Sequence, residues 1–353
     1  MKTNVNSSIN WINILKVLCM VLIYLNHSEF YCGTTVGELR NIYLPFFVPA
    51  FFFVSGYLLF MKQLKDPLIS LNAKEWFNFA GGGKVLILNI IHKMVIPSVL
   101  FSSFIYFPKK ILRGQDLDLS GFLIETIGGC TYWFTSALVL AELILVFLLL
   151  TRVKKIGFYV GMGLLAAFLG YISFESGVRW TENSNFPWFW KSALAAVFYL
   201  TLGGLYCKYE ANIDKKLGLN NWWIIVLLSF VYICYCLFDF SVYKGGLDNT
   251  HITIGSALLS IIGIMVIISI CKKVSTTKFF DYWGRNTIGL YFMCGAIPNT
   301  MAIILGKVMS VGLPMLIICW GLSFIVALAV VYLLNRFVPS VFDLRKSKRF
   351  QLQ

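Results

Sequence analysis

Long stretches of hydrophobic residues alternate with short polar segments along most of the chain. A transmembrane helix needs about 20 consecutive, mainly apolar residues, because the helix rises about 1.5 Å per residue through a hydrocarbon core about 30 Å thick. Ten stretches approach or meet this length: 11–31, 42–61, 86–107, 132–151, 156–174, 187–207, 222–240, 251–271, 286–306 and 313–335. The pattern predicts an all-α polytopic membrane protein with about ten transmembrane helices.

The stretch at 86–107 is the least regular of the ten, since His92, Lys93 and Pro97 interrupt its apolar run. A proline inside a helix removes one backbone donor and its ring clashes with the carbonyl group four residues earlier. We expect a helix here with a local irregularity before Pro97.

Composition supports membrane embedding. The chain has 353 residues, of which 58% are hydrophobic and 13% charged, with a mean hydropathy of +0.77, and this is too apolar for a soluble protein of this size. The segments between the apolar stretches are too short to fold alone. We therefore expect one membrane domain at 11–335, preceded by a polar leader at 1–10 that is not part of a cleaved signal, and followed by a basic tail at 336–353.

The distribution of positive charge predicts the orientation. If the leader faces the cytosol, about 20 of the 30 Lys and Arg residues lie at the inner ends of the helices and 8 at the outer ends. The positive-inside rule then places both termini in the cytoplasm. We expect the protein in the cytoplasmic (inner) membrane. The net charge of +14 is spread over all the inner loops, which favours contact with anionic membrane lipids and argues against a nucleic-acid partner.

The nine cysteines form no C-x-x-C pair and have no histidines at zinc-ligand spacing. We interpret them as small core residues and expect no metal site.

His27, near the outer end of the first stretch, is one of only three histidines. An ionisable group within a membrane is costly and by default marks a functional site. Lys16 lies eleven residues earlier, and eleven residues return a helix to within about 20° of its starting direction with a rise of about 16 Å. Lys16 and His27 therefore share one face. The alternative for His27 is a structural histidine that is hydrogen-bonded between helices.

Several motifs resemble those of the acyltransferase-3 family of membrane acyltransferases. The run Trp11-Ile-Asn-Ile-Leu-Lys16 followed by His27 is similar to the family's first signature, and the aromatic run at 45–58 to its second. Three later motifs continue the resemblance in order: His92 to Pro97, Tyr132-Trp133-Phe134, and Trp283 to Tyr291. The likeness is greatest to the branch that contains fucose-acetylase-like and surface-polysaccharide O-acetyltransferases.

The chain departs from the family pattern at four positions. Lys16 stands where many relatives have Arg, Asn13 where an Asp is frequent, and Phe47 and Cys294 where His is common. These departures affect the residues expected to bind the substrates, whereas His27 is retained.

The resemblance implies an O-acyltransferase that moves an acyl group, most simply acetyl from acetyl-CoA, to a hydroxyl of a cell-surface or lipid-linked glycan. His27 would act either as general base or as an acylated relay. A flippase or exporter of such a glycan, without covalent chemistry, is the main alternative, and a signalling or scaffold protein is a third.

The same resemblance suggests donor-binding residues. Lys16 and Lys93, with His92 as a further candidate, would attract the phosphate groups of CoA. The alternative for Lys93 is that its side chain extends to the lipid headgroups.

Three further residues are candidates for orienting or acceptor-binding roles. Glu29 lies two residues after His27 on a different face, and Glu142 is an acid in the middle of a helix, where structural pairing with Lys16 or Lys93 is the alternative. Trp133 would stack on a sugar ring or belong to the interfacial aromatic belt.

Overall fold

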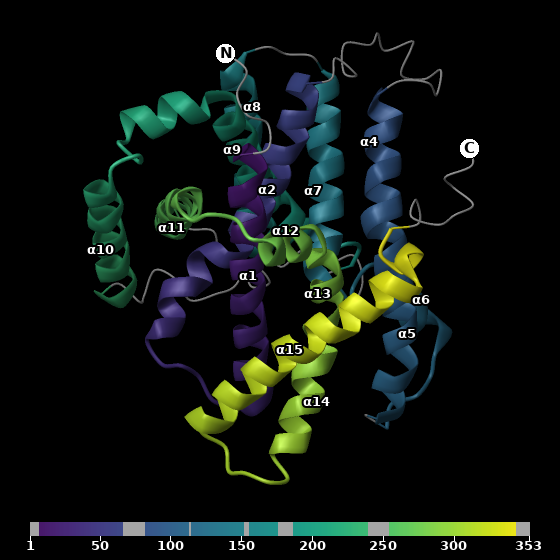
Figure 1. Cartoon of the computed structure of the whole chain (residues 1–353). Helices are drawn as coiled ribbons and strands as arrows, with labels where there is room; N and C mark the ends of the chain where they lie inside the picture. Colours follow the sequence, from purple (N-terminus) through teal and green to yellow (C-terminus); the bar gives the residue numbers. More distant parts are fainter. Residues whose placement is uncertain are drawn as a thin grey trace. The chain divides into compact units, whose positions relative to one another are not determined.

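The structure is a computed structural model that describes residues 7–65, 82–112, 114–151, 155–175, 186–238 and 254–343. Every regular element within these ranges is helical, and the predicted all-α class is confirmed (Figure 1). Residues 1–6 of the predicted leader and 344–353 of the predicted basic tail lie outside the described residues.

Each of the ten predicted stretches holds a helix or a series of short helices, listed here in chain order: α1 (Ser7–Cys32), α2 (Leu39–Lys65), α4 (Gly82–Ile90) with α5 (Ile96–Leu112), α7 (Trp133–Leu150), α8 (Ile156–Glu175), α9 (Trp190–Lys216), α10 (Trp222–Phe238), α11 (Ile254–Lys273), α13 (Thr287–Met293) with α14 (Ala296–Leu305), and α15 (Leu313–Phe337). Two short helices, α6 (Leu119–Thr126) and α12 (Lys278–Arg285), lie between them. The first helix begins at Ser7, inside the segment predicted as a polar leader.

In the described part of the chain, five helices are long and apolar enough to cross a membrane, or six if the bent pair α13 and α14 forms one span. Large apolar side chains are exposed along α8, α10 and α15, for example Phe168 (58%), Phe230 (64%) and Ile325 (62%). Such surfaces are unfavourable in water and suit a lipid environment. These features make the protein a polytopic membrane protein.

The chain divides into two compact units, which we describe separately. Unit 1 comprises Met1–Phe51, Ala211–Gly246 and Thr253–Val338, and unit 2 comprises Phe52–Glu210, Leu247–Ile252 and Pro339–Gln353. Two of the boundaries fall within helices, one in α2 after Phe51 and one in α9 after Glu210, and α9 has a non-helical residue, Tyr209, beside the latter.

Unit 2 contains a close crossing of α2 and α9 that depends on glycine. A Cβ atom on Gly56 would lie 1.8 Å from the Leu200 carbonyl oxygen, and one on Gly203 would lie 1.8 Å from that of Phe53. Small residues let the backbones of membrane helices approach each other. Gly56, the glycine of the second signature at 45–58, is thus explained by helix packing.

The expected irregularity before Pro97 is a π-helix, η2 (Ile91–Val95), that joins α4 to α5. The Ile96 N–H donates to the Ile91 carbonyl, five residues back, which widens the turn just before the proline ring. The helical path thus continues from Gly82 to Leu112 instead of ending at the proline.

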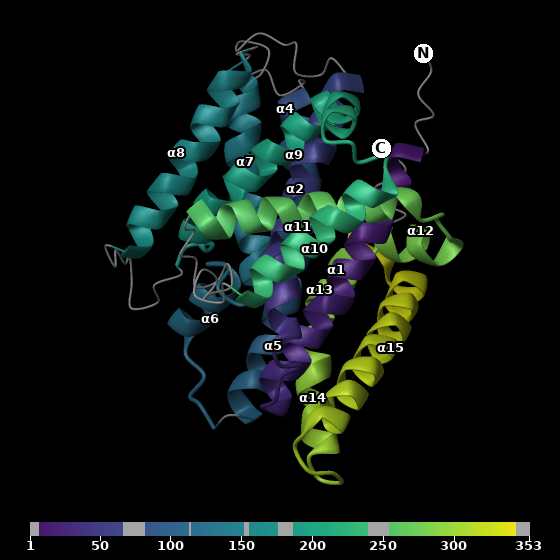
Figure 2. The same cartoon turned by 90° about the vertical axis from the view of Figure 1, so that its left-hand side faces the viewer.

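Unit 1 is built around α1, which packs against α11, α12, α13, α14 and α15. Figure 2 shows α12 beside the beginning of α1. There a Cβ atom on Gly284 would lie 2.5 Å from Asn13 Cβ, so only glycine allows this approach. Asn13 Nδ2 also lies 3.3 Å from Asp281 Oδ1, to which it donates a hydrogen bond.

The predicted single helix at 286–306 is wrong in detail, because α13 and α14 meet at 45° around Cys294 and Gly295. At the break the Cys294 N–H donates to Tyr291 O, so it does not occupy the Leu290 carbonyl as it would in a regular helix. The buried Tyr24 hydroxyl of α1 donates to that carbonyl instead, at 2.8 Å. A side chain 266 residues away thus stabilises the break.

Candidate active site around His27

His27 lies in the last two turns of α1, and its side chain is partly exposed. Its imidazole stacks on the ring of Tyr31, one helical turn later, with the ring centroids 6.2 Å apart and the planes at 19°. This contact places the Tyr31 ring beside the imidazole. Among the described residues, we find no hydrogen-bond or ion-pair partner for either imidazole nitrogen.

The neighbours of His27 also carry polar atoms without partners among the described residues. Asn26 Oδ1 and Ser28 Oγ are both buried and both lack a hydrogen bond there. Ser28 is fully buried, with 0% exposure. The sequence drew attention to this tripeptide through its histidine alone, and it contained no signal that the two flanking side chains would be unpartnered.

Ser28 differs in this respect from other hydroxyl residues within the helices. Serine and threonine commonly donate to the carbonyl group four residues earlier. Examples among the described residues are Ser103, Thr126, Ser173, Thr201, Ser229, Ser269 and Thr300. The Ser28 hydroxyl does not, which leaves it available to a water molecule or a ligand.

The carboxylate of Glu29, in contrast, has several hydrogen-bond partners. Its side chain is 3% exposed and accepts hydrogen bonds from the Val36 N–H at 2.8 Å and from the Tyr43 hydroxyl at 2.6 Å. Arg40 Nε lies 3.4 Å from the same carboxylate. These contacts hold the loop between α1 and α2 against the end of α1. The carboxylate of Glu29 therefore has a structural role, which its sequence position alone did not indicate.

Lys16 lies about three turns before His27 on the same unbroken helix, and its side chain is half-buried. Because α1 is continuous from Ser7 to Cys32, helix geometry keeps Lys16 and His27 on one face, about 16 Å apart along the axis. Lys16 takes part in contacts within the protein.

His92, Lys93, Trp133 and Glu142 belong to unit 2. The π-helix η2 carries His92, which is half-buried, and Lys93, which is exposed. It packs against α7, the helix that holds both Trp133 and Glu142. These four predicted residues therefore lie on two adjoining segments, η2 and α7, of unit 2. Lys16, His27 and Glu29 belong to unit 1.

Trp133 opens α7 and is half-buried in an aromatic cluster, with ring centroids 6.0 Å from Phe134 and 6.4 Å from Phe189. Glu142, further along α7, is 9% exposed and takes part in contacts within the protein. In the loop before α7, burial and then the Glu125 carboxylate raise the pKa of the Cys130 thiol to about 11. This thiol is therefore uncharged at neutral pH.

All nine cysteines are free, and six of them are buried, which agrees with their interpretation as small core residues. In the described ranges, no three His, Cys, Asp or Glu side chains lie close enough together to hold a metal ion.

Comparison with known proteins supplies the class of the chain. The sequence model of the acyltransferase-3 family, described as an acyltransferase domain, matches residues 9–336. The chain belongs to this family. No curated protein and no solved structure was found to match it.

The matched residues cover all ten predicted stretches of this multi-pass membrane acyltransferase. Unit 1 of the acyltransferase also joins two of the motifs that suggested the family. Asn13 of the first motif lies against Gly284 of the late motif, and its amide donates to Asp281. The carboxylate at this contact is on α12 and the amide is on α1. Asn13, which stands where many relatives have Asp, therefore pairs with an acidic side chain from another helix.

Proposed function

We propose that this membrane acyltransferase transfers an acyl group, most simply acetyl, from cytosolic acyl-CoA to a hydroxyl group of a cell-surface or lipid-linked glycan, with His27 as the catalytic base or acyl relay. Membership of an acyltransferase family favours acyl transfer over the transport alternative. The donor, the acceptor and the role of His27 are the parts of the proposal that need experiment.

In the direct route, an imidazole nitrogen of His27 takes the proton of the acceptor hydroxyl as the oxygen attacks the thioester carbonyl carbon. The carbon–sulfur bond breaks, and the CoA sulfur leaves with the proton returned by the imidazolium. In the relay route, the imidazole nitrogen attacks the thioester first, the carbon–sulfur bond breaks, and the CoA sulfur leaves with the ring's N–H proton. The acceptor oxygen then attacks the acyl carbon, the carbon–nitrogen bond breaks, and the hydroxyl proton returns to the ring. An imidazole suits either route because its ordinary pKa, about 6.5, leaves it largely neutral at physiological pH.

The observation that carries the proposal is the state of His27 within a membrane helix. A structural histidine at this depth is expected to be hydrogen-bonded between helices, since an unsatisfied polar group there is costly. Among the described residues, the His27 ring has only its stacking contact with Tyr31. The arrangement supports a ring that is held in one orientation by Tyr31 while its nitrogens are kept for a substrate.

The adjoining polar atoms support the same interpretation. Asn26 Oδ1 can accept a hydrogen bond, and Ser28 Oγ can both donate and accept one. Buried polar groups are nearly always satisfied, so each atom calls for a partner that the described residues do not provide. A hydroxyl-rich acceptor is one class of molecule with the matching donors and acceptors.

Lys16 is proposed to bind a phosphate of the donor, because it shares the His27 face of α1 on the side that the charge distribution assigns to the cytosol. Lys93 and His92 are proposed as further donor contacts on η2, where the widened turn precedes Pro97. Lysine suits this task as a compact charge on a flexible stem.

The test is the incorporation of label from radioactive acetyl-CoA into glycan, in membranes that contain the native protein or the His27→Ala variant at equal amounts. Loss of labelling in the variant is expected. A matched control is Phe30→Ala, on the next turn of α1, because Phe30 is 77% exposed and its removal should leave labelling unchanged.

Three other outcomes are informative. Equal labelling by native protein and His27→Ala would remove His27 from the mechanism. Labelling that depends on His27 but also appears on the protein itself, and is released by hydroxylamine, would indicate the relay route. No labelling by either protein, with acetyl, succinyl and longer acyl donors, would favour the transport alternative.

A further inference from the structure

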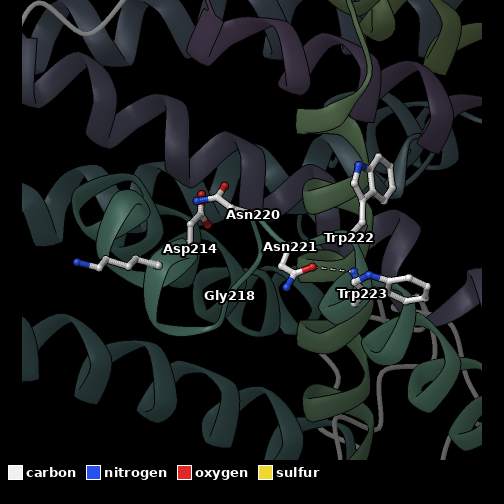
Figure 3. Close-up of a pocket in the computed structure, with 7 residues that line it drawn as sticks. Asp214, Gly218, Asn220, Asn221, Trp222 and Trp223 are labelled. Atoms are coloured by element: carbon white, nitrogen blue, oxygen red, sulfur yellow. Dashed lines mark hydrogen bonds between the residues drawn. The ribbon is translucent and has the colours of Figure 1, made fainter.

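A cavity of about 680 Å³ lies in unit 1 where α9 ends and α10 begins. The residues that line it are Asp214, Lys215, Gly218, Asn220, Asn221, Trp222 and Trp223. Figure 3 shows the polar Asp214 and Asn220 on one side and the aromatic Trp222 and Trp223 on the other. The mechanism proposed above does not use any of these residues.

The local fold of this corner is well defined. At the end of α9 the Leu219 N–H donates to Asp214 O at 2.9 Å and the Gly218 N–H to Lys215 O at 3.3 Å, which is the pattern of a Schellman C-cap. Gly218 takes the left-handed conformation that this cap requires, with φ of 64°. At the start of α10, Asn221 Oδ1 accepts the Trp223 N–H at 3.0 Å as an N-cap, as drawn in Figure 3.

Two lysines at the end of α11 hold the walls of the cavity. Lys272 Nζ lies 2.6 Å from Asp214 Oδ2, and Lys273 Nζ donates to Asn220 O at 2.7 Å. Lys273 also lies over the ring of Trp222, with its Nζ 6.0 Å from the centroid. The cavity is thus braced by a third helix and does not depend on the connecting turn alone.

These contacts leave the cavity with an excess of positive charge. Its one lining carboxylate, Asp214, is paired with Lys272. Lys215 lines the cavity, is exposed, and has no acidic partner among the described residues. Because the lining carboxylate is paired with Lys272 while Lys215 adds a positive charge, the described lining of the cavity favours an anion.

The aromatic side of the cavity continues into a surface suited to lipid. Trp222 is 55% and Trp223 81% exposed, and the exposed apolar side chains of α10 continue from them through Leu227 (60%) and Phe230 (64%). Tryptophan is enriched where a membrane protein passes from the headgroup layer into the hydrocarbon. A molecule with a phosphate at the polar side of the cavity would therefore meet apolar surface at its aromatic side.

We infer that this corner is a binding site for one anionic phospholipid, with its phosphate near Lys215, its headgroup hydroxyls near Asn220, and its acyl chains along the exposed face of α10. Phosphatidylglycerol has the required chemistry, whereas phosphatidylcholine places a permanent positive charge where the lysines lie. The site is independent of acyl transfer at His27.

The test uses the whole purified protein in neutral detergent and measures the shift in its unfolding temperature as phosphatidylglycerol or phosphatidylcholine is titrated in. Phosphatidylglycerol is expected to stabilise the native protein at lower concentration. The variant Lys215→Gln is expected to weaken this half-maximal effect about fivefold, which is the size of one lysine contact of about 1 kcal/mol with an anionic lipid.

Lys216→Gln is the matched control, because Lys216 is the next residue of α9, is exposed and does not line the cavity. It should leave the titration close to that of the native protein. A second arm replaces the lipid with glycerol 3-phosphate or inorganic phosphate. If either soluble phosphate has the same Lys215-dependent effect, the site recognises phosphate without lipid, and the lipid assignment is overturned. Equal loss in Lys215→Gln and Lys216→Gln, or no difference between the two lipids, would overturn the site itself.

Discussion

His27 and Glu29 are two residues apart on the same helix, yet the protein surrounds their polar atoms in opposite ways. The Glu29 carboxylate is 3% exposed and is bound by Val36, Tyr43 and Arg40. The His27 ring is partly exposed and, among the described residues, has only a stacking contact. The comparison separates a group whose contacts stabilise the fold from one that the proposed function assigns to chemistry, although both are ionisable residues at one end of a membrane helix.

The largest expected effect is on catalysis at His27. Replacement of the ring by His27→Gln keeps a polar side chain but removes the base, so acetyl transfer should fall about 10³-fold. The unfolding temperature should change little, because no hydrogen bond within the described residues is lost. Transfer assays and thermal unfolding on the same preparation measure both. A variant that unfolds far more easily would show that His27 is structural and would end the contrast with Glu29.

Glu29 should show the reverse pattern. The change Glu29→Ala leaves the Tyr43 hydroxyl, the Val36 N–H and Arg40 without their shared acceptor, and we expect a loss of about 3 kcal/mol in the free energy of unfolding. Glu29→Gln retains one acceptor oxygen and should lose less. Denaturant titration in detergent measures the difference. If Glu29→Ala is as stable as the native protein but inactive, Glu29 belongs to the active site after all.

An intermediate effect, on stability, is expected for Gly284 of α12, which contacts the beginning of α1. The change Gly284→Ala places a methyl group against the Asn13 side chain and should destabilise the protein by about 2 kcal/mol. Gly321→Ala is the matched control, since a Cβ atom there has no neighbour within 4 Å, and alanine is the better helix former. Thermal unfolding of the two variants should therefore shift in opposite directions. Similar losses in both would mean that the α1–α12 approach is not as close as described.

The smallest effect concerns the hydroxyl beside His27. Ser28→Ala removes a buried polar atom that has no partner among the described residues, so stability should stay the same or increase by up to about 1 kcal/mol. Ser269→Ala, in α11, removes a buried hydroxyl that donates to Met265 O at 2.7 Å, and should not increase stability. Thermal unfolding compares the two. A clear loss for Ser28→Ala alone would show that its hydroxyl is already satisfied, for instance by a buried water molecule.

The sequence alone determined the helical class, the positions of the ten apolar stretches, the order of the family motifs and the shared face of Lys16 and His27. All of these depend on hydropathy, on helical period or on local residue order, which operate within one helix. Even the π-helix before Pro97 had a local cause, since the proline lacks a donor.

The tertiary structure determined which helix faces pack together and which side chains bond across them. The bond from Tyr24 to the Leu290 carbonyl, the contact of Asn13 with Gly284 and Asp281, and the three partners of Glu29 depend on which faces meet. A membrane helix is apolar toward lipid and toward its neighbours alike, so hydropathy does not distinguish the packed face from the lipid-facing one. The same reason explains why the cavity beside Lys215, built by the ends of three helices, could not be read from any one segment.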